Sequence, residues 1–107
     1  MKIKRFDLVI VNLDPTIGSE IKKTRPYVVV SPNEMNRHLH TAIVVPLTSQ
    51  FKDYPTRVEV TTQRGKGYAV VDQIRTIDRR RITKVVGSIL PPEQQALVRT
   101  IRETLVD

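Results

Sequence analysis

A dense set of polar side chains follows the first apolar run of the chain, and its chemistry suits a bound phosphate. The set comprises Ser19, Glu20, Lys22, Lys23 and Arg25. It lies between two β-branched runs at 8–11 and 27–30, in a loop that is longer than a hairpin needs. Loops of this length are typically functional or disordered. One carboxylate among three cations at the ends of strands is the arrangement that an enzyme needs around a phosphate.

Arg25 is the candidate phosphate clamp, because a guanidinium stays charged and its fork matches two phosphate oxygens. It directly precedes Pro26, whose fixed φ limits its movement. Glu20 is the carboxylate nearest the basic cluster, so it is the candidate general base. Two alternatives remain open for these residues. Arg25 could form a structural ion pair with Glu20 or Asp14, and Glu20 could be an ordinary solvated side chain.

Further polar groups lie in the second half of the chain. Asp72-Gln73 follows an apolar run, so one of the two side chains is expected to point inward. Gln73 could contact a ligand while Asp72 fixes the loop, and hydrogen bonding in the core is the alternative. The arginines that follow either track a polyanion or form a solvated face; they are Arg75, Arg79, Arg80 and Arg81. His38 and His40 have no third ligand nearby, so we expect neither a metal site nor a cofactor.

Charge and composition narrow the class of protein. The chain has 107 residues, which suits one domain spanning 1–107 with a modest core. It contains no cysteine and no apolar run of roughly 20 residues, so we expect a cytoplasmic protein that does not span a membrane. Its net charge is +7, from 18 basic and 11 acidic residues. A polyanion or an acidic peptide is therefore the expected partner.

The elements that position these groups are mostly strands. Apolar runs at 8–11, 27–30 and 42–45 predict buried strands, the third of them stopped by Pro46. Residues 57–61 alternate, a turn is expected at Gly65-Lys66-Gly67, and a last strand spans 82–89 with Gly87 as a bulge. From Pro91 onward apolar residues recur at helical spacing. The order predicts a small, mostly antiparallel barrel closed by a C-terminal helix.

Three blocks of the sequence together resemble the MazF/PemK/Kid toxins of bacterial toxin–antitoxin systems. The blocks are Leu13-Asp14-Pro15 with Gly18-Ser19-Glu20 and Lys23-Thr24-Arg25-Pro26, then Asn36-Arg37 with Thr41 to Ser49, then Asp72 to Asp78. The resemblance implies an SH3-like barrel, a homodimer, and a sequence-specific, metal-independent endoribonuclease that cleaves single-stranded mRNA. It also implies 2′,3′-cyclic phosphate and 5′-hydroxyl products, and inhibition by an antitoxin with an acidic C-terminal tail.

The same resemblance assigns roles to single residues. Arg25 and Thr48 would be the catalytic pair, with Thr48 giving a hydroxyl hydrogen bond to the phosphate and Glu20 acting as base or orienting the 2′-hydroxyl. The RNA-binding set would be Ser19, Lys22, Lys23, Ser49, Gln73, Arg75 and Arg79. A Thr after a strand also commonly caps a turn, which is the structural alternative for Thr48. With only five aromatic residues, we expect RNA held by phosphate contacts and a few splayed bases.

The sequence also departs from the family pattern. Phe6 stands where members commonly have Gly before the Asp of the first strand, and Ser19 and Val70 stand where one branch has a catalytic His and Arg. The His/Arg/Asp mechanism of that branch therefore does not carry over. Two other functions are alternatives for this sequence. A gyrase-poisoning toxin of the same fold is disfavoured because the chain lacks Trp. A non-catalytic RNA-binding module is disfavoured by the presence of Glu20, Arg25 and Thr48 together.

Overall fold

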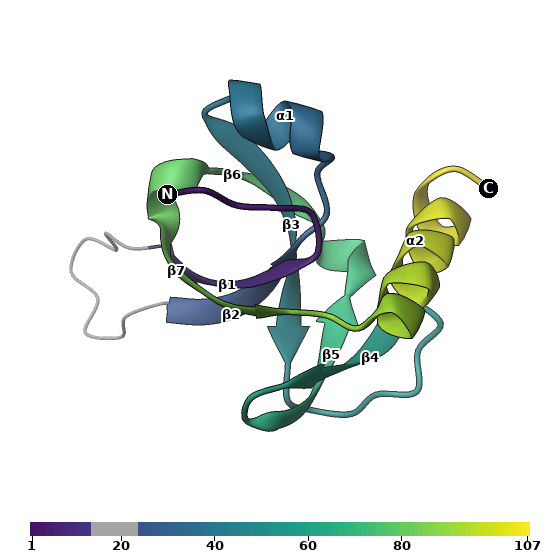
Figure 1. Ribbon diagram of the computed structural model, residues 1–107. Coiled ribbons are helices and arrows are strands. Elements are labelled where there is room, and N and C mark those ends of the chain that lie inside the picture. Colours follow the sequence, from purple (N-terminus) through teal and green to yellow (C-terminus); the bar gives the residue numbers. More distant parts are fainter. Residues whose placement is uncertain (14–23) are drawn as a thin grey trace.

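Most of the chain forms one curled antiparallel sheet with a long helix beside it (Figure 1). The computed structural model describes residues 1–13 and 24–107. Within them, the strands are β1 Asp7–Asn12, β2 Thr24–Val29, β3 Thr41–Thr48, β4 Arg57–Thr62, β5 Gly65–Val70, β6 Arg75–Asp78 and β7 Ile82–Ser88. The helices are α1 Asn33–His38 and α2 Pro91–Leu105, with short 3₁₀ turns η1 Val71–Gln73 and η2 Arg79–Arg81. The expected fold, mainly β with a C-terminal helix, is confirmed.

Strand β3 is the centre of the sheet. One edge pairs with β2, while the other pairs with β6 along Thr41–Val44 and with β5 at Leu47 and Thr48. The sheet order is β4-β5-β3-β2-β1-β7, and every strand pair is antiparallel. The sheet curls into a half-barrel, in which the β4–β5 hairpin lies apart from β1 and β7 (Figure 1). On this second edge, the two ends of β3 therefore pair with different strands.

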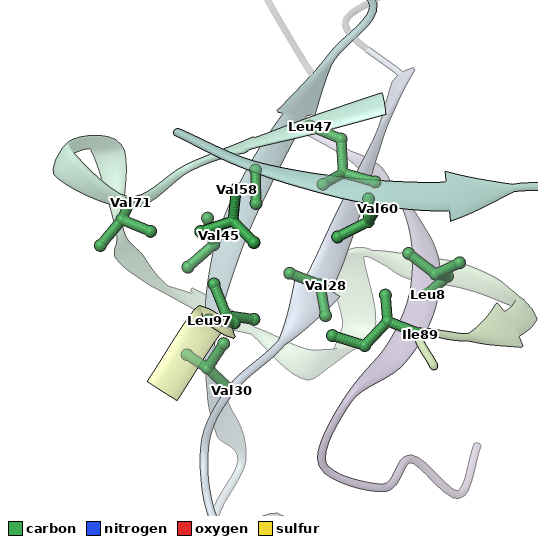
Figure 2. Close-up of a cluster of buried hydrophobic side chains, with 11 residues drawn as sticks. Leu8, Val28, Val30, Val45, Leu47, Val58, Val60, Val71, Ile89 and Leu97 are labelled. Atoms are coloured by element: carbon green, nitrogen blue, oxygen red, sulfur yellow. The ribbon is translucent and has the colours of Figure 1, made fainter. Parts of the chain in front are cut away.

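The central strands are buried on both faces, which explains their continuous apolar runs. Successive residues of one strand belong to different clusters: Val28 and Val45 lie on the α2 side, and Val29 and Val44 lie on the other. Figure 2 shows Leu97 of α2 reaching in among the side chains of the first cluster. Because α2 adds its apolar stripe to only one face, the second cluster is closed by the chain segments around β6 and β7, through Ile77 and Ile82.

Helix α2 is fixed to the sheet at its first turn. The Glu93 carboxylate accepts hydrogen bonds from the Leu90 N–H at 2.9 Å, the Thr61 N–H at 2.8 Å and the Thr61 hydroxyl at 2.9 Å. Two of these donors belong to β4, so the acid that caps the helix also anchors it to the β4–β5 hairpin. No helix within the described residues is long and apolar enough to cross a bilayer.

Two expected boundaries are wrong. Pro46 does not stop β3, which continues to Thr48. The β6 pairing ends at Val44 and the β5 pairing starts at Leu47, so on that edge Pro46 lies where no neighbouring strand needs its missing N–H. The tight turn is at 63–64, and the expected turn residues Gly65 to Gly67 begin β5 instead. The bulge is confirmed, because the β1–β7 register shifts between Leu8 and Val9, opposite Gly87.

Phe6 occupies a backbone conformation that normally calls for glycine. Its φ is +75°, in the left-handed region, and its N–H and C=O bond to Val29 O at 2.6 Å and to the Ile89 N–H at 3.1 Å. These bonds fix the chain reversal that leads into β1. A side chain in this region costs roughly 1–2 kcal/mol. The position at which the sequence departs from the family Gly is therefore a strained one.

Candidate active site

Arg25 and Thr48 lie on neighbouring strands, at the ends that meet. Tyr27 of β2 lies opposite Pro46 of β3, and two residues further along each strand come Arg25 and Thr48. Because the strands are antiparallel, continuing the register puts these two residues across from each other. The fold thus brings together the two residues for which the sequence predicts catalytic roles.

Both residues line a pocket of about 190 Å³ at this end of the sheet. Its apolar wall is buried and consists of Pro46, Leu47 and Val70. Its polar lining is Arg25, Thr48, Gln50, Lys52, Arg57 and Gln73. Three of these side chains are cationic, and none of the described residues that line the pocket is acidic. A pocket with this charge and an apolar wall favours an anion, because attraction strengthens where water is partly excluded.

The Arg25 side chain is exposed at the pocket, and it has no carboxylate partner within the described residues. Its backbone is fixed in the β1–β2 ladder, where Arg25 lies opposite Val11 and Pro26 lies opposite Ile10. A guanidinium on a rigid strand, with no carboxylate partner among the described residues, suits a phosphate ligand. The alternative ion pair with Asp14 or Glu20 involves residues outside the described part of the chain.

Thr48 has a structural role as well as a place in the pocket. Its Oγ1 accepts a hydrogen bond from the Gln50 N–H at 3.2 Å, and this bond is the turn cap expected as the structural alternative for Thr48. A hydroxyl can accept one bond and donate another. The turn cap therefore orients the hydroxyl of a pocket-lining residue, and the hydroxyl hydrogen remains available to a ligand oxygen.

Gln73 also lines the pocket, on the turn that carries the chain from β5 to β6. Both Asp72 and Gln73 are exposed, so the expectation that one of them points inward is wrong, and so is the alternative of core hydrogen bonding. The turn is tied to the preceding loop by the Val71 N–H, which donates to Thr56 O at 3.0 Å. Gln73 remains a predicted RNA-binding residue, now next to Arg25 and Thr48.

Other predicted binding residues lie apart from this pocket. Ser49 is exposed beside Thr48 but does not line the pocket. Arg75 lies opposite Val44, in the middle of β3, and does not line the pocket. Arg79 donates to Met1 O at 2.7 Å and to Leu39 O at 3.3 Å, so its guanidinium already holds the N-terminal segment. The hydrogen bond from Arg80 lowers the pKa of Asp78 to about 2, so Arg80 is also engaged.

The remaining predicted residues lie outside the described part of the chain. They are Ser19, Glu20, Lys22 and Lys23. Their segment, residues 14–23, connects Leu13 to Thr24, the first residue of β2.

Sequence reasoning missed three residues of the pocket: Gln50, Lys52 and Arg57. They belong to the segment from the end of β3 to the start of β4, which folds back beside β5. The one local signal was Arg57, the first residue of the alternating strand, but alternation alone does not say that β4 starts at a pocket. No cluster of three or more metal-ligating side chains occurs within the described residues.

The family model and similar proteins of known function all point to one family. The family model for the PemK-like, MazF-like toxin of type II toxin–antitoxin systems matches residues 4–105. Endoribonuclease toxin MazF of Escherichia coli strain K12 is 39% identical over 92 residues, which are 85% of this chain and 83% of that protein. Endoribonuclease EndoA of Bacillus subtilis strain 168 is 37% identical over 89 residues, which are 78% of this chain and 77% of that protein.

Solved structures agree in fold. A MazE–MazF crystal structure from Deinococcus radiodurans superposes with a TM-score of 0.85 and 25% identity, covering 98% of this chain and 96% of that one. An endoribonuclease in complex with its cognate antitoxin, from a mycobacterial species, gives a TM-score of 0.81 at 23% identity, covering 96% and 94%. With the family match over almost the whole length and the sequence blocks in register, the chain belongs to the PemK-like, MazF-like toxin family of type II toxin–antitoxin systems.

Proposed function

We propose that this protein is a toxin endoribonuclease that cleaves single-stranded RNA without a metal ion, as a single domain over residues 1–107. The observation that carries the proposal is the pocket in which Arg25 and Thr48 meet among cations. The relatives named as endoribonucleases support the same activity for this chain.

In this mechanism the ribose 2′-hydroxyl attacks the adjacent phosphorus and the 5′-oxygen leaves. The products are a 2′,3′-cyclic phosphate and a 5′-hydroxyl. Arg25 stabilises the negative charge that grows on the phosphate oxygens, and the Thr48 hydroxyl donates to one of them. A guanidinium keeps its protons in proteins, so Arg25 acts through charge and not as an acid. Glu20 is the proposed base or orienting group for the 2′-hydroxyl.

The substrate is unpaired RNA, mRNA above all, and the site of action is the cytoplasm. A duplex cannot place its backbone in a pocket of this size, whereas a single strand can turn its phosphate inward and splay the flanking bases. Gln73 and Ser49, together with Ser19, Lys22 and Lys23, would contact the nucleotides beside the cleaved bond, and Arg75 would lie further along the strand.

The protein acts as a homodimer, and a cognate antitoxin with an acidic C-terminal tail inhibits it. The solved relatives that contain an antitoxin support the second statement. Carboxylates of such a tail would compete with RNA phosphates for Arg25 and Lys52, because one cationic pocket attracts either ligand.

The chemistry of the products tests this proposal. A short RNA that contains one mapped cleavage site is incubated with the protein in EDTA, and the ends are identified by their reactivity with polynucleotide kinase and by mass. We expect a 5′-hydroxyl and a 2′,3′-cyclic phosphate. A single 2′-deoxy substitution directly before the cleaved bond should abolish cleavage, because it removes the nucleophile. Cleavage of the 2′-deoxy substrate, or 5′-phosphate ends, would contradict the mechanism.

A further inference from the structure

Arg57 is a pocket residue in which one donor has no partner among the described residues. It lies at the start of β4 and lines the same pocket as Arg25 and Thr48. Within the described residues, its Nε is buried without a hydrogen-bond partner, and no carboxylate forms an ion pair with it. Because Nε itself is buried, a ligand in the pocket would meet the other N–H groups of the guanidinium.

The contact that does hold Arg57 is aromatic. Its guanidinium carbon lies 5.2 Å from the ring centroid of Tyr54, which is 53% exposed. Nearby in sequence, Phe51 is exposed and packs edge-on against Tyr68 of β5, with the ring centroids 5.5 Å apart. Three of the five aromatic residues of the chain therefore gather around the segment between β3 and β4 and its neighbour β5.

A guanidinium stacked on an aromatic ring suits the reading of a base. Stacking leaves the edge of the guanidinium, with its N–H donors, as the surface that a ligand meets. That edge matches the O6 and N7 acceptors of guanine, the commonest specific contact of arginine with a base. In unpaired RNA this edge of guanine is accessible, and exposed aromatic and arginine faces supply stacking surfaces. Arg25 and Lys52 provide charge for the phosphate in the same pocket.

We propose that Arg57, held on Tyr54, is a specificity-determining residue that selects guanine at a nucleotide beside the cleaved phosphodiester. This inference rests on the proposed function, since it places the guanine next to the phosphate bound by Arg25 and Thr48. A bidentate contact of this kind should favour guanine over other bases about 5- to 140-fold.

The test uses two pools of random single-stranded RNA. One pool is unmodified, and its cleavage sites in EDTA are mapped by sequencing the new ends. The other is fully 2′-O-methylated, so it binds without being cleaved, and the bound fraction is sequenced. Both are applied to the wild type, Arg57→Gln, Arg57→Lys and Tyr54→Leu. Arg64→Gln is the matched control, because Arg64 is exposed at the β4–β5 turn and does not line the pocket.

We expect one position with at least about fivefold enrichment of guanine in both pools for the wild type and Arg64→Gln. Arg57→Gln and Arg57→Lys should both lose it, because neither keeps the planar fork, and Tyr54→Leu should weaken it. Urea unfolding of each variant separates this result from loss of fold. The proposal is overturned if no position favours guanine, or if the preference survives in Arg57→Gln.

A phosphate contact is the competing role, and the lysine variant distinguishes it. If Arg57 only binds phosphate, Arg57→Gln should weaken binding equally for all sequences and Arg57→Lys should restore most of it. That outcome would also overturn the proposal. Failure of the proposed function has a different signature. The unmodified RNA would stay intact with the wild type, while an Arg57-dependent guanine preference in the methylated pool would still support this inference.

Discussion

Thr48 shows how a single residue can serve the fold and the site together. Its Oγ1 accepts a hydrogen bond from the Gln50 N–H in the loop after β3, and Thr48 also lines the cationic pocket. The structural and the functional interpretations of this residue are therefore compatible. Arg57 also has two roles. It is the first residue of β4, where its guanidinium lies over the Tyr54 ring, and it lines the pocket.

At Phe6 the backbone and the side chain make opposite demands. Phe6 packs against the first core cluster, yet its φ of +75° favours glycine. The variants Phe6→Gly and Phe6→Ala both remove the ring, so they differ only in how well they tolerate this φ. We predict that the glycine variant is more stable than the alanine variant by about 1 kcal/mol in urea unfolding.

Leu39 gives the matched comparison for Phe6. It is half exposed and has an ordinary extended backbone with φ of −104°. There the order should reverse, with Leu39→Gly less stable than Leu39→Ala by about 0.5–1 kcal/mol. The same order at both positions would contradict the strain at Phe6.

Among the elements, α2 depends on one carboxylate for its attachment to the sheet. Glu93 joins the start of the helix to Thr61 of β4, and Leu97 follows one turn later in the core. We predict that Glu93→Ala lowers the free energy of unfolding by about 0.5–2 kcal/mol, because the N–H groups of Leu90 and Thr61 exchange a charged acceptor for water.

Chemical unfolding of Glu93→Ala in urea measures this loss, with Glu103→Ala as the control. Glu103 is an exposed residue on the same helix, and its replacement should stay within about 0.5 kcal/mol of the wild type. Equal effects of the two variants would show that Glu93 does not anchor the helix.

The elements also show what the sequence could and could not predict. Continuous β-branched runs predicted β1, β2 and β3, because strands buried on both faces need apolar residues at every position. Strand β6 was missed since only Ile77 of its four residues is buried. Pro46 gave a wrong end for β3, because whether a strand needs an N–H at one position depends on where its neighbours start and stop. The predicted pair Arg25 and Thr48 came from motifs, whereas Lys52 and Arg57 reach the pocket only through folding of the segment after β3.

At the scale of the whole molecule, basic charge is concentrated outside α2. Residues 92–107 contain two arginines and three acidic residues, so their net charge is −1. Because the whole chain has a net charge of +7, residues 1–91 have a net charge of +8. The pocket adds a local concentration of this charge, with Arg25, Lys52 and Arg57 around one cavity. The positive charge of the whole molecule attracts RNA over long range, and the positive charge of the pocket binds its phosphate.

This charge predicts how RNA binding depends on salt. The dissociation constant of a 2′-O-methylated single strand should rise steeply with salt, because each neutralised phosphate contributes about 0.7 to the slope of log K against log salt. Lys52→Gln should lower the slope by about 0.7, with Arg64→Gln as the control. Fluorescence anisotropy over a salt series measures both. An unchanged slope for Lys52→Gln would remove Lys52 from the phosphate site.

Cleavage by an Arg25 variant tests the central claim most directly. Wild type, Arg25→Ala and the control Arg64→Ala are incubated in EDTA with a long single-stranded RNA, and cut sites are mapped by primer extension with initial rates. The account predicts discrete cuts by the wild type and the control, and a rate about 10²–10³ lower for Arg25→Ala at unchanged positions. Intact RNA with the wild type would contradict the nuclease assignment. Full-rate cleavage by Arg25→Ala would keep the enzyme but place its phosphate clamp elsewhere.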